Sequence, residues 1–395
     1  MKRYYLAVFL LYLLNSTTSC NGQIIKTASS NNQENDKTPG IPQNITATDT
    51  SAGWIQSGQK MLLTGIVYEQ DGKTPAPGVV VYYYHTNTEG KYLHKPEEKR
   101  SLPPNELGQT HGYIRGWVKT DTIGRYFIYT VRPGAYPGRD EPAHIHLTIK
   151  EPNVKEYYID DIVFDDDKLM TTKRRIKLEN RGGTGIVRLV QQGGLHIGER
   201  NIILGLNIPD YPGKTTNVTG SGKNIGEDIM SFTPFHAWGP DKGTKTCPIC
   251  KYGWYHGILY FVGNNPDWAE IKQWLVFLET ESKKRQKYLK VYFIYGNETA
   301  YSKAEREKEL ENTGRELQLE KVALTFVPSF SDMDSDIYLN QVNPKVNNTI
   351  IIYKRSNVID KFINLKPNQE NFNLFSKRLD QTVNEYFDLP RARHD

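Results

Sequence analysis

The sequence predicts a mainly β protein in which an antiparallel β-sandwich is followed by an α/β domain. Between residues 58 and 212, short stretches rich in β-branched and aromatic residues alternate with turn residues, and no long helical pattern separates them. After a polar Gly/Thr/Ser break at residues 211–224, strand-like and helix-like stretches alternate. Such alternation is typical of a sheet with helices on both faces. The length of 395 residues is enough for two or three domains.

Residues 1–20 have the pattern of an export signal. A Lys-Arg start is followed by an apolar run over residues 4–14, which is too short to span a bilayer as a permanent helix. The small polar residues before Cys20 resemble the lipobox of bacterial lipoproteins, although Thr17 stands where Leu is usual. We therefore predict a lipid-anchored exported protein that faces the periplasm or the cell surface, with ordinary cleavage as the alternative. Residues 21–52 lack apolar periodicity and are predicted to be a disordered tether.

The charge of the chain gives no reason to predict a nucleic-acid partner. The 50 Lys and Arg residues exceed the 45 Asp and Glu residues by five, which gives a formal net charge of +5. Both signs are interspersed along the chain, without the clustered basic stripe that nucleic-acid binding needs.

The predicted sandwich domain, residues 53–212, contains a constellation of histidine and tyrosine. His144 and His146 lie two residues apart in an apolar stretch, so in a strand both imidazoles project from the same face. Tyr136 lies in a loop rich in Pro and Gly, and Tyr92 directly follows a turn that contains Gly90. Two imidazoles and two phenolates suit a hard ferric ion better than zinc. The alternative is two strand histidines and two surface tyrosines, in a chain with 25 Tyr.

The same region resembles the intradiol ring-cleavage dioxygenases over about residues 58–208. The shared motifs occur in the family's order: Arg115-Gly116, Thr120-Asp121, Gly124 with Tyr126, Pro133-Gly134 with Tyr136-Pro137, and His144 with His146. The resemblance implies a β-sandwich that holds Fe(III) through Tyr92, Tyr136, His144 and His146. It also implies that Tyr136 acts as the departing base while Tyr92 stays on the metal. The implied reaction opens a catechol-type ring with O2 to a muconate-type diacid.

Two positions depart from the family pattern. Glu141 stands where the family commonly has Arg, and Asp161 corresponds to a common Gln. Two acids beside the metal predict a preference for a neutral catechol over a carboxylated one, because like charges repel. Arg139 in the nearby loop is a candidate replacement for the missing cation.

The predicted second domain, residues 233–390, follows a linker at residues 213–232. Its strands and helices are expected in the order β-α-β-α-β-β-α, which resembles the thioredoxin-like fold. Cys247 and Cys250 form a C-x-x-C pair for which a structural disulfide, redox activity and a zinc site shared with His236 and His256 all stay open. In thioredoxins the pair follows a central strand at a helix start, whereas here it precedes an apolar strand.

Two functions from different classes follow. The first is a ferric dioxygenase acting on an aromatic diol with O2, anchored at a membrane through Cys20. The second is a surface binding module on a dioxygenase-type sandwich, which the two acidic departures and the added domain would suit. A ferric phenolate colour in the purified protein distinguishes them, because it requires intact ligation by tyrosine.

Overall fold

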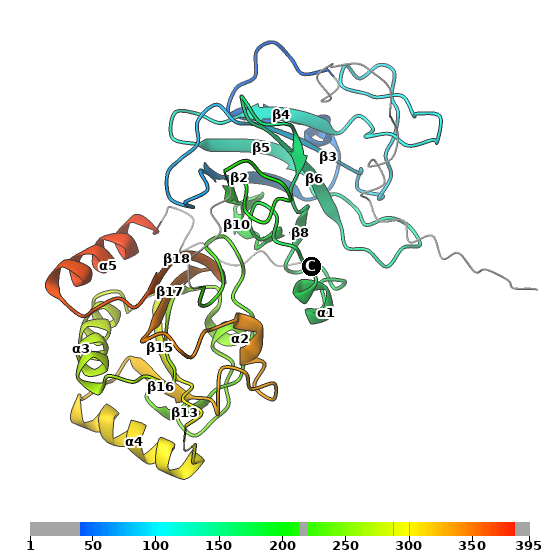
Figure 1. Cartoon of the computed structure of the whole chain (residues 1–395). Helices are drawn as coiled ribbons and strands as arrows, with labels where there is room; N and C mark the ends of the chain where they lie inside the picture. Colours follow the sequence, from blue (N-terminus) through cyan, green and yellow to red (C-terminus); the bar gives the residue numbers. More distant parts are fainter. Residues whose placement is uncertain (1–39, 214–219, 287, 300, 384–395) are drawn as a thin grey trace, which may run out of the picture. The chain divides into compact units, whose positions relative to one another are not determined.

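The computed structural model describes residues 40–213, 220–286, 288–299 and 301–383 (Figure 1). The predicted signal, Cys20 and most of the predicted tether lie outside the described residues. Within those residues, no helix combines the length and the apolar character needed to cross a bilayer.

Two mixed sheets form the first half of the described chain. The first sheet has the order β1-β5-β2-β11-β10, with β12 also paired to β2, and the second has the order β4-β3-β6-β8-β9, with β7 paired to β6. The strands of the first sheet are β1 (Thr48–Thr50), β2 (Lys60–Tyr68), β5 (Arg125–Val131), β10 (Val190–Gln192), β11 (Leu195–Glu199) and β12 (Ile202–Ile203). Those of the second are β3 (Val80–His85), β4 (Arg115–Lys119), β6 (His144–Lys150), β7 (Tyr157–Tyr158), β8 (Ile162–Phe164) and β9 (Ile186–Val187). The short helices η1 (Ala52–Ile55) and α1 (Thr172–Ile176) lie outside the sheets.

One hydrophobic core joins the inner faces of these two sheets. Met61 and Leu63 of β2 pack in the same buried cluster as Val81 of β3 and as Ile145 and Leu147 of β6. Because side chains alternate along a strand, the buried Ile145 and Leu147 leave His144 and His146 on the opposite face of β6. The core therefore fixes the direction in which both histidines point.

The sheets are mixed, which corrects the expectation of purely antiparallel pairing. β2 pairs with β5 and β3 pairs with β6 in antiparallel fashion, as a sandwich pattern predicts. However, β1 runs parallel to β5, β11 and β12 run parallel to β2, and β9 runs parallel to β8. These partners are joined by long connections, so no tight hairpin turn fixes their relative direction.

The third sheet lies in the second half of the chain and has the order β13-β16-β15-β14-β17-β18. Its strands are β13 (Phe235–Trp238), β14 (His256–Val262), β15 (Leu289–Tyr295), β16 (Val322–Phe326), β17 (Thr349–Lys354) and β18 (Asn357–Ile363). Its helices are α2 (Pro248–Tyr252), α3 (Trp268–Lys284), α4 (Lys303–Glu316), η2 (Ile337–Asn340) and α5 (Gln369–Gln381). After α2 the elements follow in the order β14-α3-β15-α4-β16-η2-β17-β18-α5, which has one strand more before the last helix than the predicted β-α-β-α-β-β-α.

Helices cover this third sheet unequally. Trp274 of α3, Leu310 of α4 and Phe375 of α5 share one core with Tyr260 and other sheet residues. The opposite face packs against Ile249 of α2, η2 and the segment that precedes β13. Figure 1 shows α3 and α5 on one side of the sheet and α2 on the other.

The ends of the first half are more ordered than their composition indicates. The predicted tether extends to residue 52, but Thr48–Thr50 form β1 against β5, and Asp49 binds Arg100 with an Nη1–Oδ2 distance of 2.7 Å. A polar segment can join a sheet through its backbone without apolar periodicity. Part of the predicted linker is likewise packed, because Ile229 and Phe232 are buried in the core of the third sheet.

Candidate functional site

Two glycines bring the tyrosines of the candidate site together. Gly90 has a φ of +77°, which favours glycine, and a Cβ there would lie 1.9 Å from the Ala135 carbonyl oxygen. A Cβ on Gly134 would lie 2.5 Å from the Thr88 carbonyl oxygen. The two loops can therefore approach closely only because both positions lack a side chain. As a result, the hydroxyl oxygens of Tyr92 and Tyr136 lie 3.1 Å apart.

The histidines reach the same point from strand β6. The Nε2 atom of His144 lies 3.1 Å from the Tyr136 hydroxyl, and the Nε2 atom of His146 lies 3.5 Å from it. Tyr92, Tyr136, His144 and His146 thus place two phenol oxygens and two imidazole nitrogens around one point. The structure brings together all four residues that the sequence singles out.

The Nδ1 atoms of both histidines contact oxygen atoms on the side away from the phenols. His144 donates from Nδ1 to the Pro142 carbonyl oxygen at 2.8 Å, and His146 Nδ1 lies 2.9 Å from Asp161 Oδ1. A carbonyl oxygen can only accept, so the hydrogen of neutral His144 is on Nδ1 and its Nε2 lone pair is available. Carboxylate or carbonyl partners of this kind orient a metal-binding histidine and raise its basicity.

An aromatic stack supports His146 from the side. The Tyr84 ring lies 4.5 Å from the His146 ring and 3.8 Å from the His111 ring, between centroids. Tyr84 pairs with His146 across β3 and β6, and His111 is held by a 2.8 Å contact between its Nδ1 and the Tyr82 hydroxyl. Sequence reasoning missed Tyr84 and His111, because the signal is a cross-strand register that spacing along the chain does not contain.

Burial shifts the pKa values of Tyr92, Tyr136 and His144. It lowers the pKa of His144, with a further contribution from the charge of His146, and so favours the neutral ring that binds metal. Burial also raises the pKa of Tyr136, and it raises that of Tyr92 well above the ordinary value. Both phenols are therefore protonated when no metal ion is bound. Binding a metal ion through their oxygens must release these protons.

The donor set fits a ferric ion. Two phenolates and two neutral imidazoles supply two negative charges and four ligand atoms, and hard anionic oxygen donors favour Fe(III). His144, His146 and Asp161 also form a possible metal cluster within the described residues. We assign Asp161 a supporting role instead, because its carboxylate contacts Nδ1 of His146 and not the Nε2 side where the phenols lie.

The geometry of the site distinguishes Asp161 from Glu141, the two acids that depart from the family pattern. Burial alone would raise the pKa of Asp161, but the charge and hydrogen bond of His146 hold it below the ordinary value. Asp161 is thus bound to a ligand and does not stand beside a substrate as a free charge. Glu141 raises the pKa of Tyr136 through its charge, and the Arg139 guanidinium lies 5.4 Å from the Tyr136 ring centroid. Arg139 therefore points back toward the site.

The residues of the second candidate site do not converge. Cys247 and Cys250 form a disulfide. His236 contacts the Thr246 carbonyl oxygen through Nε2 at 2.9 Å, and His256 contacts the Thr382 hydroxyl through Nε2 at 3.0 Å. Of the three alternatives for the cysteines, the structure contains the disulfide and assembles no four-ligand zinc site among the described residues.

Known proteins show similarity to the first half of the chain. Residues 38–177 match the model of the dioxygenase family. The protocatechuate 3,4-dioxygenase beta chain of Burkholderia cepacia is 31% identical over 119 residues, which are 29% of this chain and 48% of that protein. The chain thus spans about half the length of this curated relative. Both findings support the resemblance to intradiol ring-cleavage dioxygenases over this segment.

Solved structures with similarity include two dioxygenases. The dioxygenase domain of a dioxygenase and carbohydrate-binding fusion from Streptomyces sp. SirexAA-E is 20% identical, covers 43% of this chain and 95% of its own, and has a TM-score of 0.30. Catechol 1,2-dioxygenase from Acinetobacter sp. ADP1 is 19% identical, with coverages of 45% and 63% and a TM-score of 0.32.

Proposed function

We propose that this chain is a ferric intradiol ring-cleavage dioxygenase that opens a catechol-type ring. The observation that carries the proposal is the convergence of Tyr92, Tyr136, His144 and His146. The Tyr136 hydroxyl lies 3.1 Å from both the Tyr92 hydroxyl and His144 Nε2, and 3.5 Å from His146 Nε2. The family match over residues 38–177 supports the same reading.

In this proposal the four residues hold Fe(III), and their surroundings hold them. When bound, the ferric ion would make a chelated catecholate reactive toward O2. Tyr92 and Tyr136 lose their protons on loading, while the Pro142 carbonyl and Asp161 keep the imidazole Nε2 atoms directed at the phenols. Loading should consequently weaken as pH falls, because protons compete for the phenolate oxygens.

Tyr136 is the residue that we propose takes a proton from the substrate. The pKa of Tyr136 is raised by burial but lowered again by the hydrogen bond with Tyr92, whereas burial and the Tyr136 contact both raise that of Tyr92. Both tyrosines lie on loops, and the Tyr136 hydroxyl lies 3.1 Å from His144 Nε2 and 3.5 Å from His146 Nε2. The support for this role is the resemblance to the intradiol dioxygenases, in which the tyrosine of the Pro-Gly-x-Tyr-Pro loop leaves the metal and acts as the base.

The overall reaction balances with O2 as the oxidant. The carbon–carbon bond between the two hydroxylated ring carbons breaks, and both oxygen atoms of one O2 enter the resulting muconate-type diacid. Glu141 acts on Tyr136 through its negative charge, whereas Asp161 contacts Nδ1 of His146, so a neutral catechol is the proposed substrate class.

We also propose that the protein is exported and attached to a bacterial membrane through lipidated Cys20, and that residues 233–390 have a thioredoxin-like fold. The sequence of the first 20 residues supports the anchor, and the element order from β14 to α5 supports the fold. Labelling with a radioactive fatty acid tests the anchor: the label should appear in the wild type and disappear in Cys20→Ser.

An oxygen-uptake assay on the iron-loaded full chain tests the reaction. Catechol, hydroxyquinol and protocatechuate are supplied separately, and the products are identified by mass spectrometry after supply of labelled O2. We expect catechol to yield a diacid with both labelled atoms, and Tyr136→Phe to lose most of this activity. Bound iron without turnover of any diol would contradict the enzyme and favour a binding module.

A further inference from the structure

A polar cavity lies where the turn between β17 and β18 meets the ends of β9 and β11. It has a volume of about 50 Å³ and is lined by Arg188 and Arg200 from the first two sheets and by Lys354 and Arg355 from the third. Glu199 is the one carboxylate in its lining among the described residues. This cavity is separate from the Tyr–His cluster, which consists of Tyr92, Tyr136, His144 and His146. The proposed reaction does not use the cavity.

All four cationic side chains are buried. Arg188, Arg200, Lys354 and Arg355 are 8%, 2%, 8% and 7% exposed, respectively. Cations are almost never buried to this degree unless anions compensate them. The arrangement therefore raises the question of which anions are present.

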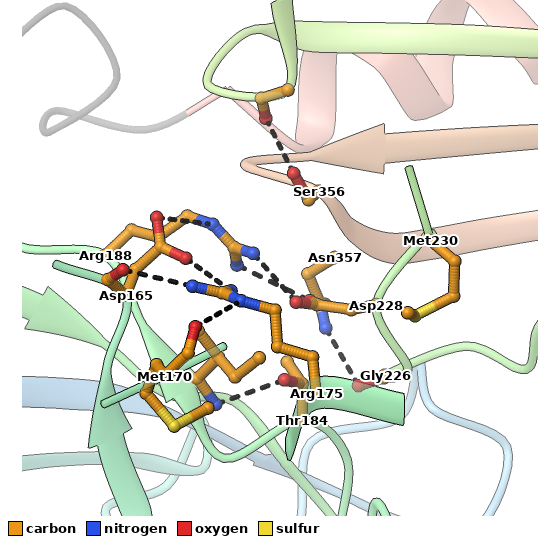
Figure 2. A network of polar contacts seen from close by, with 12 residues as sticks. Asp165, Met170, Arg175, Thr184, Arg188, Gly226, Asp228, Met230, Ser356 and Asn357 are labelled. Atoms are coloured by element: carbon orange, nitrogen blue, oxygen red, sulfur yellow. Dashed lines mark hydrogen bonds and ion pairs between the residues drawn. The ribbon is translucent and has the colours of Figure 1, made fainter. Parts of the chain in front are cut away.

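Several carboxylates lie near these cations, and Asp165 Oδ2 is 3.7 Å from Arg188 Nε. Arg188 pairs with Asp228, with an Nη2–Oδ2 distance of 2.7 Å, as Figure 2 shows. Glu199 is shared, because its Oε2 lies 3.1 Å from Lys354 Nζ and 3.8 Å from Arg355 Nη1. One carboxylate thus serves two cations.

The hydrogen bonding of Arg200 is incomplete. In the described part of the chain its Nε has no hydrogen-bond partner, and its Nη2 reaches only the Arg181 carbonyl oxygen at 3.4 Å. Burial lowers the pKa values of Arg200, Lys354 and Arg355, and nearby carboxylates oppose this: Asp160 and Asp228 for Arg200, and Glu199 for the other two. The cavity therefore offers Arg200 Nε as a buried donor that has no partner among the described residues.

We propose that this cavity binds one small tetrahedral oxyanion, of the class of inorganic phosphate or sulfate, held by Arg200, Lys354 and Arg355. A water needs roughly 10–15 Å³ of such space, so the cavity has room for one ion of this size. Guanidinium and ammonium donors are suited to phosphate-type oxygens. The ion would also join the first half of the chain to the third sheet, since its ligands come from both.

Calorimetric titration of the full chain with sodium phosphate, and separately with sodium sulfate, tests the proposal at constant ionic strength set with sodium chloride. We expect saturable binding of about one ion per chain and a rise in Tm that sodium chloride does not give. Lys354→Met should weaken binding by about tenfold or more, because a charge-assisted contact is lost. If that variant does not fold, Arg355→Gln serves with the same expectation.

Lys73→Met is the matched control. Lys73 forms an ion pair with Asp360 of β18 at 2.7 Å, so its loss removes one positive charge from the same contact between sheets but none from the cavity. Binding should stay within about twofold of the wild type in this control. Absence of saturable binding in the wild type, or equal weakening in Lys73→Met and Lys354→Met, would overturn the proposal.

Discussion

The Tyr–His cluster and the cysteine region both contain four residues that could bind a metal, yet only the first brings them together. His144 and His146 share one face of one strand, and two glycines let the tyrosine loops approach them. His236 lies on β13 and His256 on β14, which are three strands apart in the order β13-β16-β15-β14. That separation is roughly 14 Å, far beyond the reach of one ion. Histidines that are close in sequence therefore come together in space when they lie on the same face of one strand, and not when they lie on separate strands.

The largest expected effect is the loss of iron from the Tyr–His cluster. His146→Ala removes a donor atom, so we expect the iron affinity of the purified full chain to fall by about 100-fold or more. His94→Ala is the control, because His94 is exposed and its ring contacts the Ser101 hydroxyl, away from the four proposed donors. Metal analysis after dialysis measures the difference. Equal iron in the wild type and in a His144→Ala/His146→Ala double variant contradicts the site.

Stability in acid tests whether His256 is a buried, neutral histidine with a structural role. Burial lowers the pKa of His256 from 6.5 to about 3, so the unfolded chain takes up a proton before the folded chain does. Stability from this residue is complete above pH 6.5 and is lost as pH falls toward 3, by about 3 kcal/mol at pH 4. Urea unfolding from pH 7 to 4 should show a shallower loss in His256→Gln than in the wild type. Identical slopes would contradict this assignment.

The disulfide should affect stability without affecting iron. Cys247 and Cys250 close a very short loop, so Cys247→Ser/Cys250→Ser should lower the free energy of unfolding by ~2 kcal/mol. Iron content should stay at the wild-type value, because the disulfide is in the other region. Zinc bound stoichiometrically to the wild type and absent from this variant would show that the cysteines bind metal instead.

The smallest expected effect concerns substrate charge. Glu141→Gln should raise the rate with protocatechuate relative to catechol by about fivefold, since removing one nearby negative charge is worth ~1 kcal/mol. Asp140→Asn is the control, because Asp140 lies next in the chain, pairs with Arg174 and is 82% exposed. If both variants shift the ratio equally, then Glu141 does not face the substrate.

The sequence predicted the four donor residues because each lies in a local pattern: alternation in a strand, or a turn rich in Pro and Gly. Most elements of the third sheet were predictable for the same reason, since α3 buries Ile271, Trp274, Leu275 and Leu278 at helical spacing, but strand β13 was not predicted. Contacts set by register were not predictable. Asp161, which directly precedes β8, reaches His146 because β8 pairs with β6. Tyr84 stacks on His146 because β3 also pairs with β6. Strand β1 was missed because its pairing uses only the backbone.

The visible absorption spectrum of the purified, iron-loaded chain tests the central claim most directly. Ligation of Fe(III) by the phenolates of Tyr92 and Tyr136 gives a charge-transfer band that histidine and carboxylate ligands do not give. We expect a coloured protein whose band weakens in Tyr92→Phe and in Tyr136→Phe and disappears in the double variant. A colourless protein with iron bound, or a band that is unchanged in the double variant, would contradict the account.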